Sequence, residues 1–212
     1  MLTVHHLRIS QSERIVWLCE ELRMEYDLKI YNRRADNRMA PDDYKALNPM
    51  GIAPVITDGD LVLGESGAIC EYIDRKYGES RLSPAAGDPD LADHLFWLHW
   101  SNGTFMASLM MQLVLSMTEG MDKPAAAFVR DRVQRSWALA EARLGQAQFF
   151  GGRNLTTADI MMVYILTTSR AYRDAPLDDY PNIRSYLQRI GSRPAYQGAM
   201  AKAEPGWAPK LV

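Results

Sequence analysis

Two short stretches of the chain combine residue types that can bind an extended or an anionic ligand. The first is NPMGIAPVITDG, residues 48–59, in which Pro54 stands directly before an apolar run. Proline cannot donate to a sheet ladder, so we expect Pro54 at the first residue of a strand or on a sheet edge, where it can be cis. The backbone before Pro54 is then left free to bind another group.

The second stretch is Gly64-Glu65-Ser66-Gly67, which lies between an apolar run and a helical pattern. The N-terminus of a helix attracts anions, and Ser66 can offer both its hydroxyl and its backbone N–H there. The alternative is that Ser66 only caps the helix, and the two roles can coexist.

A pair of serines, Ser10 and Ser12, lies between the first apolar run and the first helical pattern. Ser12 is placed to be the N-cap of that helix, with Glu13 in its first turn. His5 and His6 precede the serines within the predicted strand. Because a strand histidine is more often structural than catalytic, we assign neither a role.

The composition excludes several other classes of protein. The net charge of −2 gives no basic field for nucleic acid and no polybasic anchor for a membrane. Cys19 and Cys70 cannot form a disulfide framework and have no zinc-binding spacing, so we expect a reducing compartment, inert core thiols and no metal. The N-terminus is too short and polar for a signal peptide, and the apolar stretch 105–117 is interrupted by polar residues. The apolar stretch 105–117 therefore predicts a buried helix and not a membrane span.

The elements that must position these residues alternate between strand and helix in the first third of the chain. Apolar periodicity predicts strands and helices in the order β-α-β-α-β-β-α, at residues 2–7, 13–22, 26–31, 41–47, 55–57, 61–63 and 64–77. A helix separates the first two strands, so they should be parallel, whereas Asp58-Gly59-Asp60 predicts a hairpin. A mixed sheet follows from this order.

The rest of the chain reads as helical. Residues 79–89 are rich in Gly, Ser and Pro and predict a linker, which divides the chain into domains at 1–78 and 90–212. Helical spacing recurs at residues 91–117, 128–144, 160–172 and 183–190. Thr156 and Asp159 have the spacing of a capping box, to which we assign a folding role only. The predicted fold class is an α/β domain followed by an all-helical bundle.

This arrangement resembles the cytosolic glutathione S-transferases, and the resemblance covers nearly the whole chain. It rests on HHLRISQSERIVWLCEEL, NPMGIAPVITDGDLVLGESGAICEYI, LTTADIMM and YPNIRSYLQRIGSRPAY, in that order. The start is most similar to serine-type bacterial and fungal members. The resemblance implies a thioredoxin-like N-terminal domain that binds glutathione as co-substrate and a helical domain that binds a second substrate. It also implies a cytoplasmic homodimer with a role in detoxification.

The resemblance assigns the glutathione-binding residues. Ala53, before a cis Pro54, would turn its backbone toward the cysteinyl part of glutathione, while Glu65 and Ser66 would hold the γ-glutamyl part. Ile52 departs from the family pattern, because close relatives often have lysine or arginine there. Its backbone can still contribute.

A compensating charge for the glycyl carboxylate can come from a loop arginine. We assign it to Arg38, and Arg33 or Arg34 are the alternatives. Because charge runs in loops are usually just solvated, weak glutathione affinity is one expectation.

The resemblance also assigns the residue that activates the thiol. The chain has no tyrosine before Tyr26 and no cysteine in the loop after the first strand, so the tyrosine and cysteine types fit poorly. Ser10 is our candidate donor to the thiolate, and Ser12 is the second candidate. Arg14 can bind glutathione or the partner subunit, but we favour a structural ion pair with a carboxylate such as Glu65.

The second substrate should bind between the two domains, against apolar side chains of the first long bundle helix. The residues that we expect to line this pocket are Trp100, Phe105, Met106, Leu109 and Met110. Methionine suits an adaptable pocket. The alternative is that this stripe is core or dimer interface.

The sequence leaves three functions open. The first is a transferase that adds the glutathione thiolate to small, largely apolar electrophiles. The second is a glutathione-dependent disulfide or peroxide reductase on the same fold. The third is a binding module without enzymatic activity, which the unusual Ile52 favours. The residues that disfavour it are Ser10, Pro54, Glu65 and Ser66.

Overall fold

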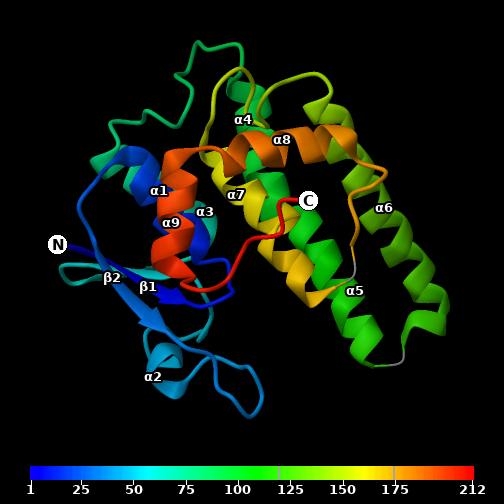
Figure 1. The fold of residues 1–212 in the computed structure, drawn as a ribbon, viewed down its shortest axis with the longest axis horizontal. Helices are drawn as coiled ribbons and strands as arrows, with labels where there is room; N and C mark the ends of the chain where they lie inside the picture. The colour runs from blue at the N-terminus through cyan, green and yellow to red at the C-terminus, as the bar shows by residue number, and fades with distance from the viewer. Residues whose placement is uncertain (119, 174) are drawn as a thin grey trace.

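The structure is a computed structural model that describes residues 1–118, 120–173 and 175–212. A four-stranded sheet with helices on both faces forms the N-terminal part, and helices form the rest (Figure 1). The N-terminal elements are β1 Leu2–Leu7, α1 Glu13–Leu22, β2 Asp27–Tyr31, α2 Asp42–Lys45, β3 Val55–Asp58, β4 Leu61–Gly64 and α3 Ser66–Tyr77. Their order and the fold class are those that the sequence predicts.

The strand order in the sheet is β2-β1-β3-β4. β1 is parallel to β2 and antiparallel to β3, and β3 forms a hairpin with β4. The mixed sheet predicted from the crossover helix and the hairpin is confirmed.

The two faces of β1 pack against different helices. Val4 lies in the main core with α1 and α3, whereas Leu7 packs in a smaller cluster with Tyr44 of α2. Because successive side chains of a strand point to opposite faces, His6 shares the face of Val4 and His5 shares that of Leu7. The two adjacent histidines therefore have unrelated surroundings.

The C-terminal elements are α4 Leu91–Trp100, a π-helical stretch Ser101–Met106, α5 Ala107–Met117, a 3-10 turn Gly120–Asp122, α6 Pro124–Leu144, α7 Thr157–Leu166, a 3-10 stretch Thr168–Tyr172, α8 Pro181–Gly191 and α9 Pro194–Ala203. Every residue of α7 is buried, and Figure 1 shows this helix in the middle of the others. Among the described residues, no helix combines the length and the apolar character that crossing a bilayer requires.

The capping box that the sequence predicts is present at the start of α7. The Thr156 hydroxyl accepts the Ala158 N–H at 3.2 Å, and the Asp159 carboxylate accepts the Thr156 N–H at 2.9 Å. The buried central helix is thus begun by its own local sequence.

The sequence pattern does not predict α9, because PAYQGAMAKA has few large apolar residues at helical spacing. α9 lies against α1, as Figure 1 shows. Trp17 and Tyr196 meet edge to face at 5.2 Å, and the Arg193 guanidinium pairs with the Glu21 carboxylate at 2.7 and 2.8 Å. This last helix therefore packs on the N-terminal domain.

Candidate active site

The predicted binding segments meet at one edge of the sheet. Val55, the first residue of β3, pairs with His5 of β1 and with Gly64 of β4. Pro54 precedes Val55 and Glu65 follows Gly64, so both lie where β1 leads into the serine loop, residues 8–12. Strand register alone therefore brings the three segments together.

The peptide bond between Ala53 and Pro54 is cis. Within the described parts of the chain, neither the N–H nor the C=O of Ala53 has a hydrogen-bond partner. The Ile52 carbonyl accepts the Asn48 side-chain amide at 3.1 Å, and the Ile52 side chain is 47% exposed. The backbone beside the cis bond is thus free to pair with an extended ligand, as the sequence suggested.

The turn from β4 into α3 leaves an open helix N-terminus. Glu65 is exposed and has a φ of 68°, in the left-handed region, which turns the chain sharply into the helix. Ser66 is buried, and a Cβ added to Gly67 would meet no atom within 4 Å. Within the described residues no partner is found for the first N–H groups of α3, so they can take an anion.

Arg14 connects the serine loop, α3 and the helical half. Its Nη1 donates to Gln11 Oε1, to Ser66 Oγ at 3.2 Å and to Asn102 Oδ1 at 3.1 Å. The expected ion pair with Glu65 is not among the contacts of the described residues. Burial lowers the pKa of Arg14 to about 10, so the guanidinium remains charged at neutral pH beside Ser66.

Ser10 and Ser12 form a hydrogen-bonded pair inside the loop. Ser10 Oγ donates to the Leu7 carbonyl at 2.6 Å and lies 2.8 Å from Ser12 Oγ. Ser12 begins α1, but its hydroxyl makes no cap bond; it accepts the Leu7 N–H at 3.0 Å instead. Ser10 is 5% exposed and Ser12 is 0% exposed, so Ser10 is the outer hydroxyl of the pair.

Behind the serines lies a buried carboxylate from the far end of the chain. Glu204 Oε1 is 3.0 Å from His6 Nε2, Oε2 is 3.1 Å from Arg8 Nε, and the Ile9 N–H also donates to this carboxylate. Burial by itself would raise the pKa of Glu204, but the bonds from His6, Ile9 and Arg8 outweigh it and lower the pKa. Sequence reasoning missed Glu204, because no local spacing connects it to residues almost 200 positions earlier.

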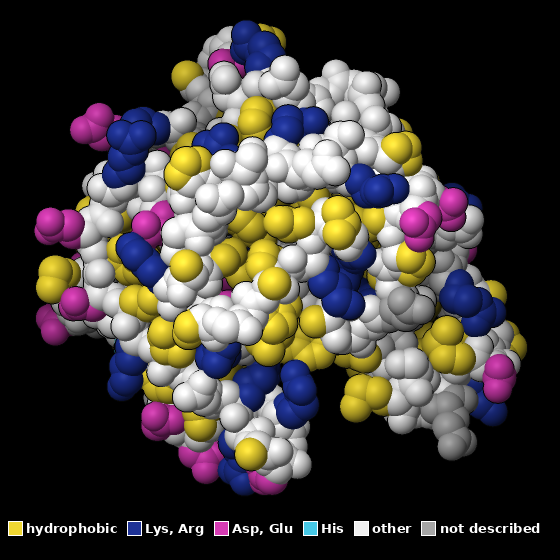
Figure 2. Space-filling view, viewed as in Figure 1, with side chains coloured by type: hydrophobic (Ala, Val, Ile, Leu, Met, Phe, Trp, Pro, Cys, Tyr) yellow, Lys and Arg dark blue, Asp and Glu magenta, His cyan; other side chains and the backbone are white. Residues whose placement is uncertain are grey.

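The three arginines that follow β2, Arg33, Arg34 and Arg38, make different contacts. Arg33 donates to the Arg8 and Ile9 carbonyls at 2.8 and 2.9 Å, and Arg34 pairs with Asp36 at 2.8 Å. Arg38 is exposed, its backbone N–H donates to the Arg34 carbonyl at 2.9 Å and its own carbonyl accepts from Arg33 Nη1 at 2.9 Å. A shallow cavity of about 340 Å³ is lined by Arg8, Ile9, Asn32, Arg33, Arg34, Ala35 and Arg38. Figure 2 shows basic side chains beside a notch between the α2 region and the ends of α5 and α6.

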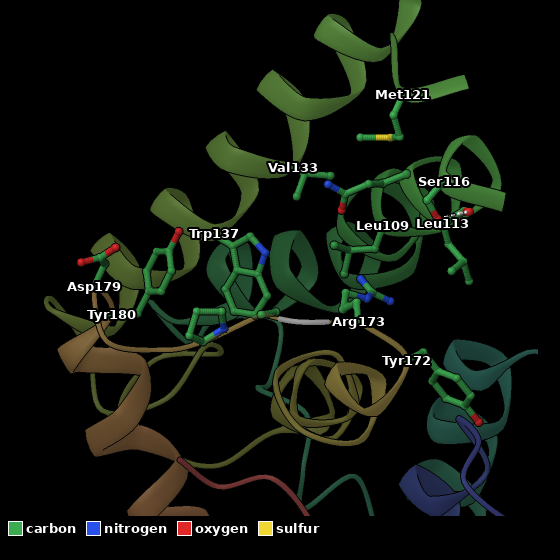
Figure 3. A pocket seen from close by; sticks show the side chains of 13 residues that line it. Leu109, Leu113, Ser116, Met121, Val133, Trp137, Tyr172, Arg173, Asp179 and Tyr180 are labelled. Carbon is green, nitrogen blue, oxygen red and sulfur yellow. Dashed lines mark hydrogen bonds between the residues drawn. The ribbon is translucent and has the colours of Figure 1, made fainter. Parts of the chain in front are cut away.

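A larger cavity of about 490 Å³ lies between α5, α6 and residues 172–173 and 175–180 (Figure 3). It is lined by Leu109, Gln112, Leu113, Ser116, Met121, Val133, Trp137, Tyr172, Arg173, Ala175, Pro176, Asp179 and Tyr180. The Tyr172 hydroxyl donates to the Ile9 carbonyl at 2.6 Å, so one wall of this cavity is joined to the serine loop.

The five residues predicted to line a substrate pocket have different positions. Leu109 lines the 490 Å³ cavity, and Phe105 is fully buried behind it, 5.1 Å from the Trp137 ring. Met106 is buried, Trp100 packs against Trp97 and Phe105, and Met110 is 47% exposed.

The two cysteines are buried in the core. Burial raises the pKa of Cys70 to about 12 and that of Cys19 further, so neither forms a thiolate at neutral pH. The described residues contain no group of three or more His, Cys, Asp or Glu side chains that could hold a metal ion.

Two family models match the chain. The model for the N-terminal domain of glutathione S-transferase matches residues 10–76, and the model for the C-terminal domain matches residues 105–194. The first range includes residues 10–12 of the serine loop, the cis bond and the start of α3, and the second includes every residue that lines the 490 Å³ cavity.

Similar proteins cover almost the whole chain. Glutathione S-transferase 3 of Schizosaccharomyces pombe is 32% identical, over 96% of this chain and 88% of that protein. Glutathione S-transferase 1 of Saccharomyces cerevisiae is 28% identical, over 96% and 95%. The crystal structure of a glutathione S-transferase from Actinobacillus pleuropneumoniae has a TM-score of 0.87 and 36% identity, over 96% of this chain and 93% of that one.

Proposed function

The chain belongs to the glutathione S-transferase family, and we propose that it activates the glutathione thiol with the hydroxyl of Ser10. It is a transferase that conjugates the glutathione thiolate to small, largely apolar electrophiles. Its relatives are named transferases, and they favour neither the reductase nor the binding module without activity.

The observation that carries the role of Ser10 is its place in the loop. A free thiol with a pKa near 8.5 is only a few per cent ionised at neutral pH, so the site must favour the anion. Ser10 is the outer of the two hydroxyls, at the sheet edge that also holds Ala53 and the start of α3. Its proton can be donated to a sulfur at this edge, whereas Ser12 is enclosed.

The surrounding groups suit the rest of glutathione. The free backbone of Ala53 would pair with the cysteinyl residue as a short antiparallel strand. The N-terminus of α3 with Ser66 would take the γ-glutamyl carboxylate, close to the charge of Arg14, and Glu65 would accept from the ammonium group. Arg38 would attract the glycyl carboxylate from the loop.

The second substrate would bind in the 490 Å³ cavity and the space between it and Ser10. Leu109, Trp137 and Tyr180 give this cavity apolar walls, which suits an apolar electrophile. Phe105 and Met106 support these walls from the core, and Trp100 and Met110 belong to the same stretch of helix. Proximity of electrophile and thiolate would then supply most of the remaining rate.

We also propose a division of labour and a cellular setting. Residues 1–78 would form the glutathione-binding domain, 79–89 the linker and 90–212 the domain for the second substrate. The exposed apolar side chains of Val62 on β4 and of Leu95 and Phe96 on α4 support a homodimer. A cytoplasmic role in detoxification accords with two free, buried cysteines.

The test is glutathione binding and turnover together. Calorimetric titration with glutathione would be followed by assays with an aryl halide and with a small disulfide, for the wild type, Ser10→Ala and the control Ser192→Ala. Like Ser10→Ala, Ser192→Ala removes one hydroxyl that donates to a backbone carbonyl, but it does so at the exposed end of α8. Aryl-halide turnover that falls about 10²-fold or more only in Ser10→Ala would support the proposal. Equal turnover in both variants would refute the role of Ser10, and turnover of the disulfide alone would refute the transferase.

A further inference from the structure

A chain of hydrogen bonds runs inward from the Ser10 hydroxyl to a buried charge. Ser10 Oγ lies 2.8 Å from Ser12 Oγ, Ser12 Oγ lies 2.9 Å from His6 Nδ1, and His6 Nε2 lies 3.0 Å from Glu204 Oε1. His6, Ser12 and Glu204 are each exposed by 1% or less. The chain thus runs from Ser10, which is 5% exposed, to a carboxylate sealed from solvent.

The carboxylate sets the direction of these hydrogen bonds. An ionised carboxylate only accepts, so His6 Nε2 carries a hydrogen and donates it to Glu204. In a neutral imidazole Nδ1 is then an acceptor, and its neighbour is the Ser12 hydroxyl. Ser12 Oγ accepts the Leu7 N–H, and its one proton has two acceptors within reach, the Leu7 carbonyl at 3.2 Å and His6 Nδ1 at 2.9 Å. The shorter contact directs it to His6.

With His6 neutral, the Ser10 proton is directed away from any ligand. Ser10 Oγ accepts the Ser12 N–H at 3.2 Å and donates to the Leu7 carbonyl at 2.6 Å. A hydroxyl has one proton, so it cannot donate to Leu7 and to a thiolate at once. If His6 gains a proton at Nδ1, the chain reverses: His6 donates to Ser12, Ser12 to Ser10, and Ser10 to the sulfur.

We propose that His6 is a positioning residue that takes up, through Ser12 and Ser10, the proton that the glutathione thiol loses on binding. This inference rests on the proposed function, in which Ser10 contacts the thiol. The S–H bond breaks and sulfur keeps the electron pair. Ser10 Oγ receives the thiol proton while its own passes to Ser12 Oγ and that of Ser12 passes to His6 Nδ1. The products are a thiolate at Ser10 and an imidazolium at His6, paired with Glu204.

Of the charges around His6, the Glu204 carboxylate favours this transfer and the Arg8 guanidinium opposes it. Glu204 is shared with Arg8, whose Nε lies 3.1 Å from Oε2 and whose positive charge works against a second cation. Burial raises the pKa of Glu13, at the start of α1, to about 8, so at neutral pH that carboxyl is mostly neutral, and it accepts the Thr168 hydroxyl at 2.7 Å. Glu204 is therefore the anion that stabilises an imidazolium here, as the acidic member of a Ser-His-Asp triad does.

The first test uses the wild type alone. Glutathione binding at neutral pH is measured by calorimetry in buffers of different ionisation enthalpy, which gives the protons released, and by the ultraviolet absorbance of the thiolate, which gives the thiolate formed. We expect a thiolate with much less than one proton released, because His6 keeps the proton. One proton released for every thiolate formed would overturn the proposal. A wild type that binds no glutathione would instead refute the proposed function.

The second test compares three variants. His6→Asn removes the group that takes the proton, and Glu204→Gln removes its counter-charge at nearly constant shape. His5→Asn is the matched control, because His5 is buried on the opposite face of β1 and bonds to Tyr31 and Thr57. Each variant is titrated for the pKa of bound glutathione by thiolate absorbance and for affinity toward S-methylglutathione, which has no thiol proton.

The expected result separates proton uptake from structure. In His6→Asn and Glu204→Gln the pKa of bound glutathione should rise by about one unit, a tenfold loss of thiolate, while S-methylglutathione affinity stays within about twofold of the wild type. The control should shift neither. An unchanged thiol pKa would overturn the proposal, and so would a parallel loss of S-methylglutathione affinity, since that would mean that His6 and Glu204 only hold the loop together.

Discussion

Removal of the Asp159 carboxylate should strongly lower the free energy of unfolding, because several buried donors depend on it. Its carboxylate accepts the Phe150 N–H at 2.8 Å, the Thr156 N–H at 2.9 Å and the Tyr186 hydroxyl at 3.0 Å. Asp159 is fully buried, and so are Phe150 and Tyr186. One side chain therefore accepts hydrogen bonds from the loop before α7, from the N-cap residue of α7 and from a tyrosine of α8.

Asp159→Ala leaves these three donors without a partner in the core. Each buried unsatisfied donor costs about 1–3 kcal/mol, so with partial relaxation we expect the free energy of unfolding to fall by about 3–6 kcal/mol. That is a large part of the 5–15 kcal/mol (roughly) that stabilises a typical domain. Asp159→Asn keeps one acceptor oxygen but turns an amide N–H toward a donor, so about half of that loss is expected.

The measurement is equilibrium urea unfolding, followed by far-ultraviolet circular dichroism and tryptophan fluorescence. Asp131→Asn is the matched control, because Asp131 forms an exposed i,i+4 pair with Arg135, worth about 0.5 kcal/mol or less. A loss below about 1 kcal/mol in Asp159→Ala, at unchanged slope of free energy against urea, would refute the idea that these three bonds hold the helical half together.

Two other predictions concern pH and affinity. Burial raises the pKa of Glu13 to about 8 from its ordinary value of 4.5, so the folded protein keeps a proton that the unfolded chain loses. Stability should therefore decline as pH rises from about 4.5 to about 8. Glu13→Gln should flatten that decline, which thermal unfolding across this pH range would measure. An identical decline in the variant would contradict the assignment. Arg38→Ala should weaken glutathione binding by about 3–10-fold, with kcat nearly unchanged, if it attracts the glycyl carboxylate; calorimetry at low and high salt checks this, and exposed Arg135→Ala, with no expected effect, is the control.

Much of the fold could be predicted because its signals are local. The alternation in β1, the Asp-Gly turn between β3 and β4 and the Thr156–Asp159 capping box each depend on a few neighbouring residues. α9 and the π-helical stretch could not be predicted this way. α9 carries few large apolar residues at helical spacing, and it is held against α1 by contacts such as that of Tyr196 with Trp17.

The candidate site likewise has features that local sequence predicts and features that only long-range packing determines. The sequence by itself pointed to Ala53-Pro54 and Ser66, because a proline before a strand and a helix N-terminus each have a fixed local chemistry, whereas Ser10 was assigned through the family resemblance. The resemblance ranked Ser10 before Ser12 as the residue that activates the thiol. The sequence also paired Arg14 with Glu65, where the structure gives it Ser66 and Asn102.

The tertiary structure alone decided which groups share the interior. His6 reads as an ordinary strand residue and Glu204 as an ordinary charge near the C-terminal end, but the packing of α9 on α1 leads the chain back to β1 and brings the two within 3.0 Å. Packing also enclosed Ser12 completely and left Ser10 slightly more exposed, at 5%. Burial and long-range contact arise from the whole folded chain, whereas propensity, capping and turn chemistry arise from a few neighbouring residues, and only the latter are written in local sequence.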